Sequence, residues 1–68
     1  MNLADIVRTE AALRQLAVRL GSEYADAAPG HVVRLVTKVA QGQANAGHRG
    51  WRLIELTELE VRERLLTD

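Results

Sequence analysis

The segment 51–66, WRLIELTELEVRERLL, decides the fold class of this chain. Its apolar side chains recur at intervals of three and four residues, which is the spacing along one side of an α-helix. Glu58 precedes Arg62 by four residues, an order of charges that stabilises helices, and the next such pair begins two residues later. We therefore predict a helix over 51–66. Its apolar residues are Leu53, Ile54, Leu56, Leu59, Val61, Leu65 and Leu66.

A first helix is predicted over 2–20. Asn2 is placed to cap its N-terminus, and Asp5 falls in the first turn, where the helix dipole favours a negative charge. Gly21 directly follows the last apolar residue and suits the left-handed conformation that ends many helices, so we expect the helix to end there. Its apolar stripe consists of Ile6, Leu13, Leu16, Ala17 and Leu20.

A second helix is predicted to begin near Pro29. Proline holds its φ near the helical value, and Asp26, just before it, can cap the new helix. The run 31–39 is rich in β-branched residues, so a strand is the competing interpretation. We favour a helix, because apolar and polar residues do not alternate strictly and no second strand is available for pairing. The apolar stripe of this helix consists of Val32, Leu35, Val36, Val39 and Ala40.

Three glycines, Gly42, Gly47 and Gly50, separate the second helix from the third. Each lowers helix propensity by roughly 1 kcal/mol relative to alanine, so we expect the second helix to fray between Gly42 and Gly47. Three helices with short connectors predict an all-α fold. The expected architecture is a three-helix antiparallel bundle that runs up, down and up as a single domain over 1–68.

Composition excludes several classes of protein. The chain has 68 residues, of which 47% are hydrophobic and 26% charged, a globular balance in a chain too short for a separate cofactor domain. It contains no cysteine, so disulfides and thiolate chemistry are absent. Its formal net charge is zero, and no apolar run reaches the roughly 18 residues that span a membrane. The segment Met1–Asp5 lacks the features of a secretory signal, so we expect a cytoplasmic protein without membrane contact.

The residues that could carry chemistry do not form a recognisable constellation. His31 and His48 are the only histidines, and their spacing is not that of metal ligands on one helix. Ser22 has no histidine near it in sequence to act as a base. The glutamates after residue 54 alternate with arginines, which is typical of a solvated helix face. We therefore expect no metal site, no cofactor and no catalytic residues, and the chain is not expected to be an enzyme.

Charge is segregated along the chain. Residues 27–54 contain no acid, whereas residues 55–68 carry five acids and two bases. The basic segment predicts either a nucleic-acid surface, as in a small phage- or antitoxin-like regulator, or a helix matched to the acidic helix or to a second copy. We favour the second interpretation, because the net charge is zero and acids on the third helix would repel phosphates. The basic residues of the alternative are His31, Arg34, Lys38, Arg49 and Arg52.

The third helix carries two apolar lines, and one small core cannot readily cover both. Trp51 is one of two aromatic residues and is expected in the core or as an anchor in an interface. We therefore predict a non-catalytic helical interaction module that forms a two-fold homodimer or binds another helical protein. The expected interface uses the third helix, aided by the first, through Leu56, Leu59, Leu66, Val7 and Val18.

Three stretches carry a resemblance to a known family: LRQLAVRL at 13–20, VVRLV at 32–36 after Pro29, and LIELTELEVRERL at 53–65. Together they resemble the small three-helix-bundle dimerization domain of actinobacterial proteins. That domain is found alone or ahead of arsenate-reductase or low-molecular-weight phosphatase-like domains. The resemblance implies a stand-alone bacterial dimerization or adaptor module. It implies no enzymatic activity, because the chain has no phosphatase loop with a cysteine followed by an arginine.

Overall fold

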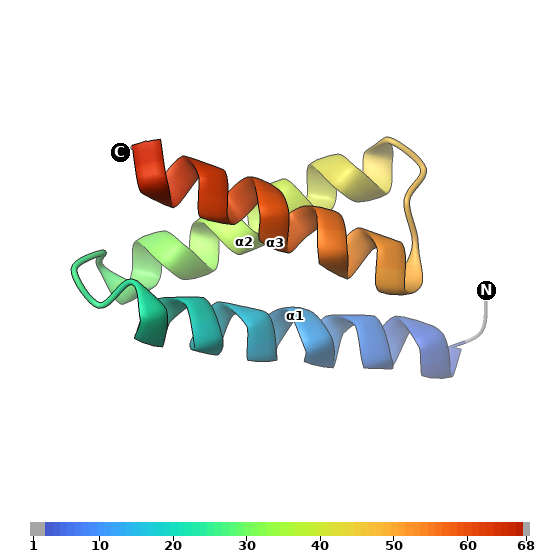
Figure 1. Ribbon diagram of the computed structural model, residues 1–68. Coiled ribbons are helices and arrows are strands. Elements are labelled where there is room, and N and C mark those ends of the chain that lie inside the picture. Colours follow the sequence, from blue (N-terminus) through green and yellow to red (C-terminus); the bar gives the residue numbers. More distant parts are fainter. Residues whose placement is uncertain (1–2, 68) are drawn as a thin grey trace.

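The computed structural model describes residues 3–67, which form three α-helices and no strand. The helices are α1 (Leu3–Glu23), α2 (Pro29–Asn45) and α3 (Gly50–Thr67). α2 runs opposite to α1, and α3 returns in the direction of α1, so α1 and α3 lie side by side with α2 packed against both (Figure 1). The predicted all-α, three-helix antiparallel bundle is confirmed. No helix in this described part is both long and apolar enough to cross a membrane.

The core lies where the three helices meet, and each helix contributes one stripe to it. Leu16 and Leu20 of α1 and Val32 of α2 are fully buried. Three of the β-branched residues of α2, Val32, Val36 and Val39, fall at helical intervals on its buried side, so packing overrides their preference for strands. The strand alternative for 31–39 is therefore wrong. The buried apolar residues are Leu16, Leu20, Val32, Leu35, Val36, Val39, Ala40, Leu53, Ile54 and Val61.

α1 continues past Gly21 and ends at Glu23, so the expected end at Gly21 is wrong. Gly21 does not adopt a positive φ. The N–H of Tyr24 still donates to the carbonyl of Leu20 at 2.9 Å, in the pattern of the helix. The extra turn is stabilised because Tyr24 packs against the same core cluster that contains Leu20. The predicted N-cap, Asn2, lies outside the described residues.

Pro29 opens α2 as predicted, but the capping residue differs from the expectation. Ala28 occupies the N-cap position, and no side chain caps the helix there, so the expected cap by Asp26 is wrong. Asp26 lies in an exposed turn two residues earlier. The backbone provides the first contacts instead, since the N–H of His31 donates to the carbonyl of Ala28 at 2.9 Å. Proline itself has no N–H that needs a cap.

α2 ends between Gly42 and Gly47, as predicted. Gly47 and Gly50 have φ values of 101° and 55°, which glycine adopts without steric cost. The carbonyl of Ala44, one of the last in α2, accepts from the N–H of Gly47 at 3.0 Å and also from Arg49 Nη1 at 2.7 Å. The two glycines and these bonds reverse the chain over four residues, and α3 begins at Gly50, one residue before its predicted start.

Candidate interaction surface

Large apolar side chains of the described residues are exposed mainly on α1 and α3. Trp51 is 74% exposed, which excludes the expected place in the core and leaves the expected place in an interface. On α2, by contrast, Val33 alone belongs to this exposed set. The exposed apolar residues on the other two helices are Leu3, Ile6, Val7 and Val18 on α1, and Trp51, Leu59 and Leu66 on α3.

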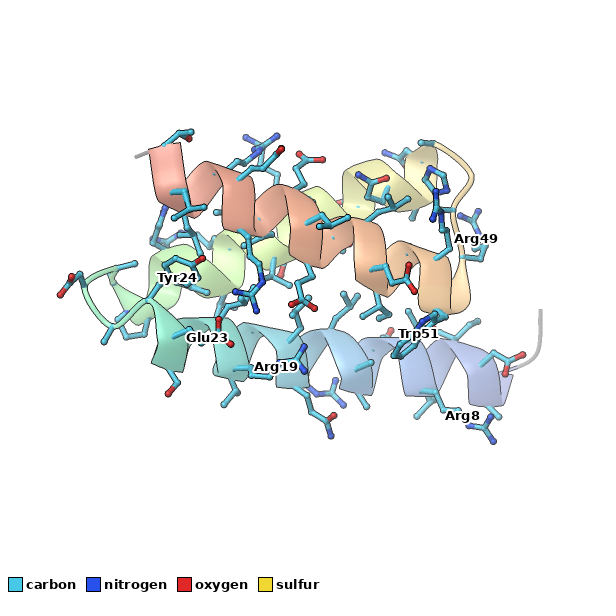
Figure 2. All side chains as sticks on the ribbon, viewed as in Figure 1. Arg8, Arg19, Glu23, Tyr24, Arg49 and Trp51 are labelled. Carbon is cyan, nitrogen blue, oxygen red and sulfur yellow. The ribbon has the colours of Figure 1, made fainter. Side chains whose placement is uncertain are left out.

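α1 and α3 enclose a groove of about 750 Å³, which we call the α1–α3 groove. Ile54, which is buried, and Ala12, which is half-buried, form its floor, because the exposed residues stand above them. Figure 2 shows Trp51 at the start of α3, directed toward α1. Val18, which is 75% exposed, lines the groove from α1. The groove therefore combines an apolar floor with two exposed apolar side chains.

The groove continues toward the beginning of α1. A second hollow of about 490 Å³ shares Ala12, Trp51 and Ile54 with the first. The indole of Trp51 therefore stands within one continuous surface rather than at its edge. The other residues that line the second hollow are Asp5, Arg8, Thr9, Arg49 and Gly50.

The two sides of the α1–α3 groove carry opposite charges. α1 contributes Arg14 and Arg19, and α3 contributes Glu55 and Glu58. Arg19 Nη2 lies 3.4 Å from Glu58 Oε1, so one ion pair crosses the groove. Arg14 and Glu55 are exposed and form no ion pair within residues 3–67. The apolar floor thus has one basic side and one acidic side, each with an unpaired charge.

Ion pairs close the groove toward the C-terminal ends of α1 and α3. Arg62 Nη1 lies 2.6 Å from Glu23 Oε2, and Arg62 Nη2 lies 2.8 Å from Glu58 Oε2. The hydrogen bond from Arg62 lowers the pKa of Glu23 and outweighs the opposing effect of desolvation. Arg64 and Glu60 also form an ion pair, at 2.7 Å. Together with the pair of Arg62 and Glu58, it confirms both ion pairs predicted within α3. α1 and α3 are therefore clamped at one end and open at the other.

The interface residues predicted from the sequence lie in four different places. Val18 lines the α1–α3 groove, and Val7 is exposed on α1 outside it. Leu59 and Leu66, which are 63% and 75% exposed, lie seven residues apart and so form one line on the solvent side of α3. Leu56 is half-buried. The structure thus brings Val18 together with Trp51 and places the exposed leucines of α3 on a separate line.

Sequence reasoning missed the floor of the groove. Ile54 was expected only as part of an apolar line on the third helix, and Ala12 was not singled out at all. Ala12 precedes Leu16 by four residues, so both fall on the same side of α1. A small side chain among large apolar side chains on the same side of a helix is the signal that could indicate a gap between two helices. That signal does not reveal which neighbouring helix borders the gap.

The basic residues of the nucleic-acid alternative are only partly brought together. His31, Arg34 and Lys38 are exposed and are spaced so that they follow one side of α2. Arg34 and Lys38 form no ion pair within residues 3–67, so the expected matching of their charges by α3 is not observed. Arg49 lies in the connector after α2, and Arg52 is exposed on α3.

Within residues 3–67, no group of three histidine, aspartate or glutamate side chains converges in a way that could hold a metal ion. His31 and His48 lie at opposite ends of α2, one in its first turn and one in the connector that follows it. No family model matches the chain, and no curated protein or solved structure gives a significant match. Function is therefore inferred from the exposed surface.

Proposed function

We propose that this chain is a non-catalytic interaction module that pairs with a second copy of itself through the face formed by α1 and α3. The observation that carries this proposal is the exposure of Trp51 within the α1–α3 groove. A tryptophan side chain buries about 150–250 Å² when it is covered, and tryptophan is enriched among the residues that dominate binding energy. Val18 and the apolar floor extend the surface that a partner would cover.

The dimensions of the molecule suit this role. A stable interface covers about 800 Å² on each partner, which is about one sixth of the 4792 Å² that this chain exposes. The bundle measures 37 × 20 × 15 Å along its principal axes, so one of its long faces can supply that area. The α1–α3 face runs along the longest of these axes (Figure 1).

The proposal is tested by measuring the mass of the particle in solution. Sedimentation or light scattering over about ten to a hundred micromolar should show a monomer–dimer equilibrium. Trp51→Ala should weaken the dimer about tenfold or more, because it removes the proposed anchor. Val33→Ala is the matched control, since Val33 is exposed on α2 and lines neither hollow of the groove. A monomer over the whole concentration range would contradict the proposal.

The resemblance to actinobacterial dimerization domains supports the same proposal, because that family has three helices and acts by association. We extend the proposal to membership of that family and hence to a bacterial origin. The three helices of the described residues agree with the architecture that the resemblance implies. A solved member of that family whose dimer buries a face other than that of α1 and α3 would contradict the membership.

A second candidate is a nucleic-acid-binding regulator, which is favoured by the exposed row of His31, Arg34 and Lys38 on α2. Binding to phosphates would weaken steeply as salt is added, because counterions are released on binding. A titration with duplex and single-stranded DNA at low salt tests this function, with Arg34→Ala and Lys38→Ala as the variants that should weaken it. Absence of binding at low salt would eliminate this candidate.

A further inference from the structure

The charges beside the α1–α3 groove determine how a second copy can fit against it. Two identical copies that meet face to face are related by a two-fold axis that lies in the plane between them. If that axis runs across the groove, each helix meets its own copy: α1 meets α1, and α3 meets α3. If it runs along the groove, α1 of each copy meets α3 of the other. These two arrangements bring different charges together.

The arrangement with the axis along the groove matches opposite charges. It sets the basic side, which carries Arg14 and Arg19, against the acidic side of the other copy, which carries Glu55 and Glu58. The arrangement with the axis across the groove sets arginines against arginines and glutamates against glutamates, and such like-charge contacts are costly in an interface. We propose that the second copy binds with the two-fold axis along the groove, an inference that rests on the dimer proposed above.

Further features of the chain fit a second copy as the occupant. The chain has no formal net charge, so two copies do not repel each other as wholes. Arg14 and Glu55 form no ion pair within residues 3–67 and are available to a partner. A second copy has the same acidic side and the same basic side, separated by the same distance. Its acidic side can therefore meet the basic side of the first copy while its basic side meets the acidic side of the first copy.

The position of Trp51 agrees with this arrangement. Trp51 lies on α3 and shares both hollows with Ala12 of α1. When α3 of one copy faces α1 of the other, each indole faces the part of the opposite α1 around Ala12. The small side chain leaves space there for an aromatic ring. Ala12→Leu should therefore weaken the dimer, because it fills that space without changing any charge.

Charge reversal provides the decisive experiment. Arg14→Glu and Glu55→Arg should each weaken the dimer at least about tenfold, because each sets like charges against each other twice in a symmetric pair. An equimolar mixture of the two variants should form a heterodimer close to wild-type affinity, as should a chain that carries both changes. Circular dichroism should show unchanged helicity in every variant, since both side chains are exposed and unpaired within residues 3–67.

Cysteine cross-linking gives a second measurement that does not depend on charge. The chain has no cysteine, so each introduced thiol is the only one. Gln15→Cys and Glu55→Cys lie on opposite sides of the groove. Mixed under mild oxidation, they should form a disulfide between the two variants faster than either variant forms one with itself, because a disulfide requires closely placed cysteines.

The outcomes separate this inference from the proposed function. A dimer that Arg14→Glu and Glu55→Arg do not weaken, whose weakened variants are not restored by mixing, or whose cysteines cross-link fastest within one variant overturns the orientation and leaves the dimer standing. A chain that stays monomeric at every concentration overturns both. Restoration by mixing together with preferential cross-linking between Gln15→Cys and Glu55→Cys supports the orientation.

Discussion

Replacing Thr57 with valine should stabilise the fold. The side chain of Thr57 is fully buried in the core, and its hydroxyl has no hydrogen-bond partner within residues 3–67. The other three threonines of the chain donate to the carbonyl four residues earlier: Thr9 at 2.9 Å, Thr37 at 3.0 Å and Thr67 at 3.1 Å. The buried threonine is therefore the one that lacks this bond.

The expected magnitude follows from removing a polar group while keeping the shape. Threonine and valine are both branched at Cβ and have the same number of side-chain heavy atoms, so valine fits the space. A buried hydroxyl without a partner costs about 1–3 kcal/mol, and Thr57→Val should raise the free energy of unfolding by a similar amount. Thr57→Ser keeps the hydroxyl and removes a methyl group, so it should lower the free energy of unfolding by roughly 1 kcal/mol.

Urea and thermal unfolding, followed by circular dichroism at one fixed protein concentration, measure these changes. The concentration must be fixed because association stabilises the folded state. For a domain of this size, 1 kcal/mol corresponds to a shift in Tm of about 4–8 °C. Thr37→Val is the control, since Thr37 is exposed and its change should stay within about 0.5 kcal/mol. A Thr57→Val protein no more stable than the wild type would show that the hydroxyl does find an acceptor.

Other changes test the ends, the ion pairs and the surface of the fold. Gly42→Ala should raise the free energy of unfolding by about 1 kcal/mol, because nothing lies within 4 Å of the added Cβ; Gly47→Ala should lower it, because φ there is 101°. The wild type should be more stable than Glu23→Gln at pH values above 4.5, the ordinary pKa of a glutamate side chain. This advantage should disappear as the pH falls through the lowered pKa of Glu23, and unfolding curves at a series of pH values would show it. Leu59→Glu should keep its helicity and leave the dimer close to wild-type affinity in sedimentation, because Leu59 is 63% exposed on a line separate from the α1–α3 groove; a clearly weaker dimer would place the exposed leucines of α3 in the interface.

The positions of the helices were predictable because each depends on a local repeat. Val32, Leu35 and Val39 of α2 recur at intervals of three and four, which fall on one side of a helix but on both sides of a strand. The helix forms despite the intrinsic preference of valine for strands, because burying one apolar side of the helix contributes more to stability than that preference does. The prediction of three helices and of their order in the bundle follows from these stripes.

The ends of the helices were less predictable, because they depend on contacts made after the helices pack. Gly21 is a plausible helix end by itself, and the packing of Tyr24 on the core carries the helix past it. Asp26 is a good capping residue, yet the turn before Pro29 places it away from the N-cap. The same holds for the groove: Trp51 follows a glycine at the start of its helix, and only the separation of α1 and α3 decides that it stays uncovered.

The clamp of Arg62 at one end of α1 has a consequence for local unfolding. Every side chain from Leu3 to Arg8 is exposed, whereas Leu16 and Leu20 are buried and Glu23 is paired with Arg62. Protection of backbone amides from hydrogen exchange should therefore rise steadily along α1, from its first turns toward its last. The first turns can open while the rest of the bundle stays folded. Because Asp5 and Arg8 line the hollow beside Trp51, a bound partner would slow exchange most in the part of α1 that opens most easily.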